Sequence, residues 1–191
     1  MDAIQPIIWG LTLAACAGFR AFLPFLFVSA MTRWGGWAEP PVIGWVASDE
    51  GFVILLAASV AEVLGDKIPV VDHALDAVQT FIKPFAGLLL TAGMLHEWSP
   101  AGAWILALAA GAPVALGVHT TKATTRAASS IFTGGLGNTL LSILEDGLAV
   151  LLVVLALVAP LLALAVVLWL VWAAAKSMGR LLQRRRAAAA G

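Results

Sequence analysis

Residues 140–157 read LLSILEDGLAVLLVVLAL, with charge only at Glu145 and Asp146. A bilayer core of about 30 Å needs roughly 20 helical residues of this apolar kind. Comparable stretches, separated by Pro, Gly and polar residues, recur along the chain. The sequence therefore predicts an all-α, polytopic membrane protein with about six transmembrane helices: Pro6 to Ala30, Gly51 to Ile68, Phe85 to Leu95, Ala101 to Ala123, Leu140 to Leu157 and Leu161 to Met178.

The composition of the 191 residues supports this class, because 61% are hydrophobic and 12% are charged, whereas soluble domains carry about 25% charged residues. One soluble core could not cover so much apolar surface, so the lipid bilayer is the expected surrounding. Basic and acidic residues number 11 each, and this balance argues against a nucleic-acid partner. Since Cys16 is the single cysteine, neither a disulfide framework nor a Cys-rich metal site is expected.

The third stretch, Phe85 to Leu95, is too short to cross a bilayer unless it recruits residues 70–83. That segment has the charges on one face and the apolar residues on the other, as in an amphipathic helix. Either its polar groups enter the membrane or the segment lies along the interface. The sequence leaves both arrangements open for the residues concerned: Asp72, His73, Asp76 and Lys83.

Positive charge predicts the orientation of the spans, because Lys and Arg are enriched in cytoplasmic loops. We expect a multi-pass protein of the cell inner (plasma) membrane with cytoplasmic N- and C-termini. This arrangement leaves only Arg33 outside and puts Arg20 within a span. All other basic residues then face the cytoplasm: Lys67, Lys83, Lys122, Arg126, Lys176, Arg180, Arg184, Arg185 and Arg186.

The two halves of the chain share a weak internal repeat. Residues 18–21 (GFRA) align with residues 117–120 (GVHT), and residues 59–62 (SVAE) align with residues 142–145 (SILE). Three spans in each half would have opposite orientations, which is the 3+3 inverted repeat of many transporters. The predicted units are a three-helix half at 1–98, a second at 99–182 and a basic, Ala-rich cytoplasmic tail at 183–191.

Several charged residues fall inside the predicted spans. Arg20 lies deep in the first, where an arginine costs about 2.5 kcal/mol or more without a partner or water, and Glu62 is its expected partner. Glu62 and Asp66 are one helical turn apart, so they could converge on a proton or cation. Glu145 and Asp146 are the acidic pair of the second half. Alternatively, Arg20 and Glu62 form an ion pair that only joins two helices. For Asp66 and Asp146 the separate alternative is that they mark hydrated helix ends.

Residues 119–138 combine basic groups, hydroxyls and a glycine-rich end. His119, Lys122 and Arg126 share one helix face, followed by Ser129, Ser130, Thr133 and residues 134–138 (GGLGN). Such a segment could hold an anion or phosphate, form a broken-helix gate, or be a basic cytoplasmic loop. The candidate ion-pathway residues are Arg20, Glu62, Asp66, Asp72, Asp76, His119, Lys122, Arg126, Glu145 and Asp146.

Metal and cofactor signals are weak. His73 beside Asp72 is a poor match to a metal site, so the sequence leaves metal binding undetermined. No cofactor and no catalytic residue is predicted.

Three motifs carry a resemblance to a known family: residues 18–24 (GFRAFLP), 62–69 (EVLGDKIP) and 119–126 (HTTKATTR). They resemble a bacterial family of small integral membrane proteins described as a domain of unknown function (DUF4126). The resemblance covers nearly the whole chain. It implies a multi-helix membrane fold and brings no substrate, cofactor or catalytic residue.

The leading functional expectation is a transporter or channel for an ion or small polar solute, with proton coupling as an option, because ionisable groups occur in four predicted spans. One chain is small for a full pathway, so a homodimer is also considered. The main alternative is an intramembrane enzyme acting on a lipid-linked phosphate, with residues 125–130 as a phosphate pocket. A membrane scaffold without chemistry is the third. We favour transport over enzymatic activity, since no complete catalytic signature is present.

Overall fold

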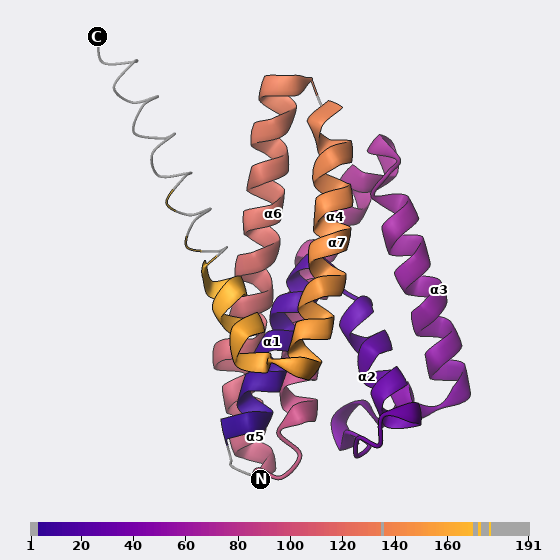
Figure 1. The fold of residues 1–191 in the computed structure, drawn as a ribbon, viewed down its shortest axis with the longest axis vertical. Helices are drawn as coiled ribbons and strands as arrows, with labels where there is room; N and C mark the ends of the chain where they lie inside the picture. The colour runs from indigo at the N-terminus through magenta and orange to yellow at the C-terminus, as the bar shows by residue number, and fades with distance from the viewer. Residues whose placement is uncertain (1–3, 135, 170–171, 173–175, 177–191) are drawn as a thin grey trace.

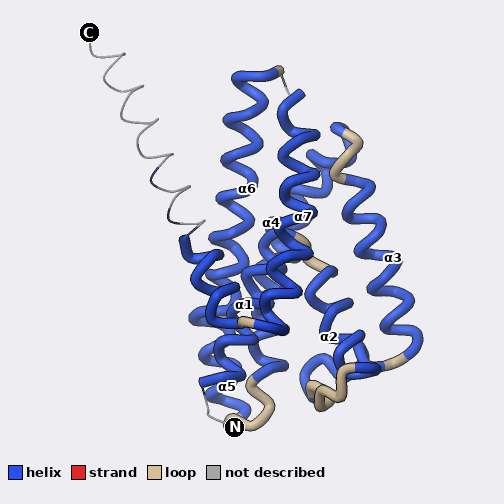
Figure 2. Tube along the Cα trace, in the orientation of Figure 1, coloured by secondary structure: helices blue, strands red, loops and turns tan. Residues whose placement is uncertain are grey.

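Figure 1 shows the computed structural model of the protein, which describes residues 4–134, 136–169, 172 and 176. Every regular element in this part of the chain is a helix, and no strand occurs in it (Figure 2). The all-α prediction is confirmed. In chain order the elements are α1 (Ile4–Phe19), α2 (Leu23–Trp34), the 3-10 helix η1 (Pro41–Ala47), α3 (Asp49–Gly65), α4 (Pro69–Met94), α5 (Pro100–Leu106), the π-helical segment η2 (Ala107–Gly111), α6 (Ala112–Thr133), α7 (Leu136–Val158) and a further helix at Pro160–Trp169.

Three helical segments are long and apolar enough to cross a membrane: Ala74–Met94, Pro100–Ile131 and Gly137–Val158. The pair formed by η1 and α3, bent by 83°, is a fourth candidate. Large apolar side chains are exposed on these helices, among them Val53, Ile105 and Leu144. Such exposure is expected where lipid is the solvent. The protein therefore has the character of a membrane-helix bundle with three to four candidate spans.

The first predicted span, Pro6 to Ala30, is wrong as a single helix, because the chain breaks between α1 and α2 at residues 20–22. Pro24 explains the break, since it has no N–H and its ring would clash with the carbonyl of Arg20 in a continuous helix. Trp9 near the start of α1 stacks on Trp37, just beyond α2, with ring centroids 4.7 Å apart. The two helices thus run in opposite directions from the break and form a V, whose open end the Trp9–Trp37 stack bridges (Figure 1). We call α1 and α2 the re-entrant pair, because the chain turns back on itself between them, and residues 20–22 the helix break.

α1 runs antiparallel to the second half of α4. The Thr91 hydroxyl donates a hydrogen bond to the Gly10 carbonyl at 3.2 Å, and the Lys83 ammonium donates to the Phe19 carbonyl, also at 3.2 Å. Lys83 lies near the middle of the candidate span Ala74–Met94. The helix break therefore lies near the mid-depth of that span.

Residues 70–83 are part of α4. They belong to one continuous helix that begins at Pro69, and Gln79 and Lys83 are buried among the other helices with 2% and 0% of their surfaces exposed. The interfacial arrangement is therefore wrong for this part of the segment, whose polar groups enter the bundle. The side chains of Asp72 and His73 lie outside the described part of the structure.

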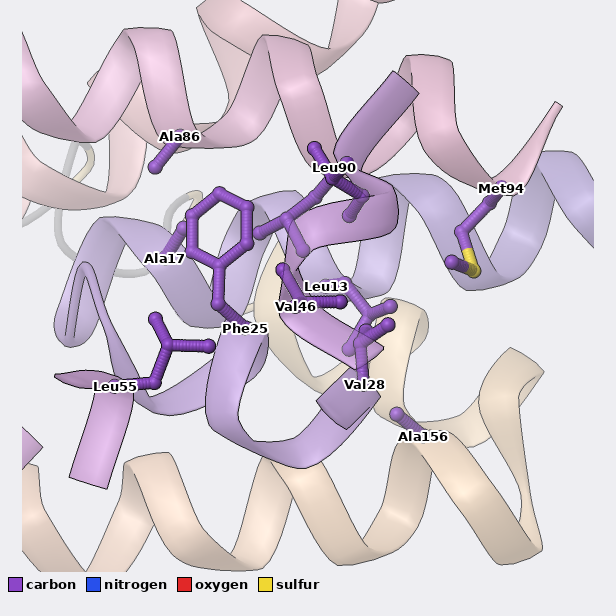
Figure 3. Packing of buried hydrophobic residues seen from close by; sticks show 11 residues of the cluster. Leu13, Ala17, Phe25, Val28, Val46, Leu55, Ala86, Leu90, Met94 and Ala156 are labelled. Atoms are coloured by element: carbon purple, nitrogen blue, oxygen red, sulfur yellow. The ribbon is translucent and has the colours of Figure 1, made fainter. Parts of the chain in front are cut away.

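Two apolar clusters hold the re-entrant pair in the bundle. One joins α1 and α2 to α3 and α4 through side chains that include Leu13, Phe25, Leu55 and Leu90 (Figure 3). The other packs α1 against α6 and α7. Because lipid is as apolar as these side chains, close packing rather than exclusion from lipid stabilises the contacts.

Glycines let α1, α4 and α6 approach one another closely. A Cβ atom added at Gly87 of α4 would lie 2.6 Å from the Ala115 Cβ and 2.7 Å from the Gly111 carbonyl oxygen. One added at Gly18 of α1 would lie 2.5 Å from the Val118 Cβ. At both positions only a hydrogen atom fits between the helices.

The two copies of the first motif in the proposed internal repeat, residues 18–21 and 117–120, differ in backbone conformation. α1 ends at Phe19, just before Arg20, whereas α6 continues through His119, the residue aligned with Arg20. The inverted repeat and the division of the chain at residue 98 stay predictions.

We expect Gly87→Val to lower the free energy of unfolding by about 1–3 kcal/mol, the usual effect of overpacking. The matched control is Gly117→Val, because a Cβ at this other helical glycine has no neighbour within 4 Å. Thermal unfolding in detergent, followed by tryptophan fluorescence, measures both variants. Equal melting temperatures for the two variants would contradict the close contact of α4 with α6.

Candidate functional site

A buried charge network surrounds the helix break. Seven of its eight members have at most 8% of their surface exposed, although they come from five separate places in the chain. Seven of the ten predicted pathway residues belong to it. The network consists of Arg20 at the break, Glu62 and Asp66 at the end of α3, Lys83 of α4, Lys122 and Arg126 of α6, and Glu145 and Asp146 of α7.

Asp66 is the centre of this network. Its Oδ2 atom lies 2.6 Å from Arg20 Nη1, 3.0 Å from Lys122 Nζ and 3.3 Å from Arg126 Nη2. The Asp66 side chain is fully buried, so it is not the hydrated helix end that we considered. One carboxylate oxygen connects the re-entrant pair, α3 and α6.

The acidic pair of α7 divides its contacts between two sides of the network. Glu145 accepts hydrogen bonds from Arg126 Nη2 at 2.6 Å and from Arg126 Nε at 3.2 Å, the bidentate geometry that suits guanidinium and carboxylate. Asp146 pairs with Arg20 through one oxygen and with Lys67 Nζ through the other, the latter at 2.7 Å. The side chains of Asp146 and Lys67 are 22% and 37% exposed. The network therefore reaches the surface at this pair.

Glu62 does not make the ion pair with Arg20 that the sequence predicts. Arg20 instead donates to the Glu62 backbone carbonyl at 3.3 Å. The Glu62 carboxylate accepts hydrogen bonds from the backbone N–H of Ala21 at 2.9 Å and of Phe22 at 3.3 Å, and from the Gln79 amide at 2.9 Å. It thus satisfies two backbone donors of the helix break, directly before α2 begins, and buried backbone N–H groups need such a partner. The expected partner was wrong because the break exposes backbone donors that a continuous helix would have used.

Lys83 and Gln79 are site residues that the predicted pathway set lacks. Both stand one or two turns after Asp76 on α4. Lys83 was counted as a basic residue of the cytoplasmic side, and Gln79, which carries no charge, was not considered. Lys83 supports the end of α1 through the Phe19 carbonyl. The re-entrant pair is therefore held at its break by a cation on one side and a carboxylate on the other.

Two predicted residues lie beside the network rather than in it. His119 is 2% exposed, and its Nε2 lies 3.1 Å from the Thr80 hydroxyl of α4. Asp76 is half-buried, and its backbone carbonyl accepts a hydrogen bond from Thr80. Asp72 cannot be placed, since its side chain lies outside the described residues.

Two expectations for residues 119–138 are wrong. Lys122 and Arg126 do not stand in a basic loop, because both belong to α6 and are buried inside the bundle. The glycine-rich segment is no broken-helix gate: α6 is continuous to Thr133, and Gly134 ends it with a left-handed φ of 60°. The chain has its helix break at residues 20–22 instead.

A pocket of about 270 Å³ gives access to the network between α6 and α7. Lys122 and Glu145 line it together with Thr121, Thr125 and four apolar side chains, one of which is Phe19. Two network residues thus border space that is open toward the outside of the bundle.

The described part of the chain contains no group of three or more His, Cys, Asp or Glu side chains placed to share a metal ion. The charges in the network are instead arranged as alternating cations and carboxylates. Such an arrangement can bind and release protons or small ions, or hold helices together.

These features define an all-helical protein of membrane-helix character, with a helix pair that turns back at its break and a buried charge network. The chain matches the family described as "Domain of unknown function (DUF4126)" over residues 7–180, and it belongs to that family. No curated protein and no solved structure matches it.

We expect Asp66→Asn to lower the free energy of unfolding by about 3–5 kcal/mol, because three buried cations would share one neutral amide. Asp49→Asn is the matched control: its Arg33 pair is at the surface, where the side chain of Asp49 is 82% exposed, and such pairs contribute about 0–1 kcal/mol. Chemical or thermal unfolding in detergent compares them. A change for Asp66→Asn no larger than that for Asp49→Asn would show that the network is not the anchor of the fold.

Proposed function

We propose that the protein is a membrane transporter or channel for an ion or small polar solute, and that the buried charge network around the helix break lies on its pathway. The observation that carries this proposal is the network itself, with seven buried ionisable side chains around a helix break that lies beside the middle of a candidate span. Charged groups are expensive inside a membrane, so they usually mark ion or proton pathways. A bundle that needed only to hold together could use apolar packing.

The re-entrant pair supports the same proposal. Non-helical backbone at membrane depth is tolerated only where protein buries it or where it lines a cavity. Transporters place such breaks at their binding sites because half-helix ends present N–H and C=O groups to ions. Here the break presents both, with the Phe19 carbonyl on one arm and the N–H groups of Ala21 and Phe22 on the other.

Access to the network is one-sided. Toward the α3–α4 and α6–α7 connections it reaches the surface through Asp146 and Lys67 and borders the pocket lined by Lys122. Toward the open end of the V, the helices close on one another at Gly87 and Gly111, where an added Cβ would lie 2.6 Å from Ala115 and 2.3 Å from Thr91. A site open at one end and closed at the other is what alternating access requires.

The finer topology is also part of the proposal. We place the Lys67 end of the bundle at the cytoplasmic side of an inner membrane, in line with the positive-inside rule. Six spans with a cytoplasmic N-terminus would need α1 and α2 to cross as one helix. The re-entrant pair instead puts the start of α1 at the outer end of the bundle, and we adopt this arrangement.

A homodimer is retained in the proposal because one chain is small for a complete pathway. Proton coupling is retained because carboxylates lie at the centre of the network.

Purified protein in phospholipid vesicles tests the proposal with a panel of monovalent cations, inorganic anions and protons. We expect a flux that Arg20→Lys lowers by about tenfold or more. One ammonium cannot bridge Asp66 and Asp146 as the guanidinium does. Arg33→Lys is the matched control, because Arg33 is exposed.

Size-exclusion profiles and melting temperatures would establish that Arg20→Lys is folded. No flux of any panel member, or an Arg20→Lys variant as active as Arg33→Lys, would contradict a pathway through the network.

A further inference from the structure

A separate cavity, of about 240 Å³, lies at the open end of the V, where α1 begins and α4 ends. This is the end of the bundle at which Figure 1 marks the N-terminus. Its wall contains the buried residues Pro6, Pro40 and Met94 and the stacked pair Trp9 and Trp37. The remaining lining residues are exposed at the surface. Since the pockets of drug-sized ligands measure about 300–1,000 Å³, this cavity suits a smaller molecule.

The polar side chains around this cavity are without partners in the described part of the chain. The Glu97 carboxylate and the His96 imidazole, both exposed lining residues, make no ion pair or hydrogen bond there. The indole N–H of Trp9 is buried and has no acceptor, although a buried indole N–H usually has one. The cavity differs in this respect from the charge network, whose ionic groups bond to one another.

The charges around the cavity favour a cation. The described residues that line it include no Lys or Arg, whereas Glu97 contributes a negative charge. The end of α4 contributes a partial negative charge, because the last carbonyl groups of a helix form the negative end of its dipole. α4 has no basic residue in its last turn to offset this charge. Aromatic rings such as those of Trp9 and Trp37 also attract cations.

We propose that this cavity binds a small organic ammonium ion that also carries an oxygen acceptor, the chemistry shared by choline, ethanolamine and the lipid headgroups that contain them. The ammonium group would lie near Glu97 and the Trp rings, and the oxygen would accept a hydrogen bond from the Trp9 N–H. This inference goes beyond the proposed transport function and does not depend on it.

The composition of the wall favours an organic cation over a metal ion. Hard metal cations need several oxygen ligands to replace their water, and the wall offers mainly ring, proline and thioether surface. The carbon atoms of an alkylammonium ion can pack against Pro6, Pro40 and Met94, while its charge is attracted by Glu97. The apolar wall and the unpaired carboxylate are therefore both used by one ligand.

Binding of choline and ethanolamine to the full-length protein tests this inference. Purified protein in a detergent with an uncharged headgroup is titrated with each compound by isothermal titration calorimetry. We expect saturable binding of both. Dimethylbutanol, the uncharged analogue of choline in which carbon replaces nitrogen, should bind about tenfold more weakly or less, because it has the shape of choline without its charge.

Two variants with matched controls locate the site. Glu97→Gln should weaken choline binding by about two- to fivefold, as for other exposed charge pairs, whereas the exposed Glu50→Gln should leave it unchanged. Trp9→Phe should weaken it by about fivefold or more, because the N–H donor is lost and the smaller ring attracts a cation less. Its control is Trp34→Phe, since Trp34 is 69% exposed and does not line the cavity.

Melting temperatures would establish that the variants are folded. If Trp9→Phe does not fold, Glu97→Gln and the uncharged analogue decide the question. The inference would be overturned by an absence of saturable binding, by equal affinity for dimethylbutanol, or by choline binding that is unchanged in Glu97→Gln or in folded Trp9→Phe.

A water-soluble short-chain phosphatidylcholine identifies the source of the ligand once choline binds. Competition with choline would support a lipid headgroup as the ligand, and binding of choline without competition would support a free ammonium compound. Because calorimetry measures binding without flux, failure of this site and failure of the transport proposal are separate results.

Discussion

The carboxylate of Asp66 is the contact on which this architecture depends. Its Oδ2 atom touches a cation at the break of the re-entrant pair and two cations of α6, while Asp66 itself ends α3. Burying any one of these cations without a partner would cost several kcal/mol, on the order of the desolvation penalty of one ion. A shared anion offsets part of that penalty for all three cations at once. The apolar clusters fill the space between the helices, but they do not determine how the helices are oriented relative to one another. The ion contacts determine this orientation.

The sequence was sufficient for the class of fold and for much of the site. The apolar stretches predict helices, and the spacing of Lys122 and Arg126 puts both on one face, which is the face that contacts Asp66. The break at residues 20–22 was not predictable in the same way, although Pro24 is visible. A proline can merely kink a membrane helix. Whether it separates two antiparallel arms depends on distant residues, here Glu62 and Lys83, that satisfy the freed backbone groups.

The sequence also did not identify Lys83 as a buried residue, because its burial depends on distant parts of the chain. Counting basic residues treats each one as a mark of the cytoplasmic side, which holds for loops and not for the interior of a bundle. From the sequence, Lys83 and Lys67 count alike, yet one is fully buried and the other is at the surface. The pairing of Arg20 was misjudged for the same reason. Helix spacing identifies which side chains share a face, but only the distance between helices decides that Asp66, and not the Glu62 carboxylate, meets the guanidinium.

The π-helical segment at Ala107–Gly111 interrupts the long helix that carries Lys122 and Arg126. A π-turn accommodates one residue more than an α-turn, and each residue of an α-helix turns the chain by about 100°. The segment therefore sets the rotation of everything that follows it relative to α5. A chain one residue shorter at this point would keep its length across the bilayer nearly unchanged and yet turn both cations away from Asp66. The register of this single turn thus selects which side of α6 is presented to the interior and which to the hydrocarbon.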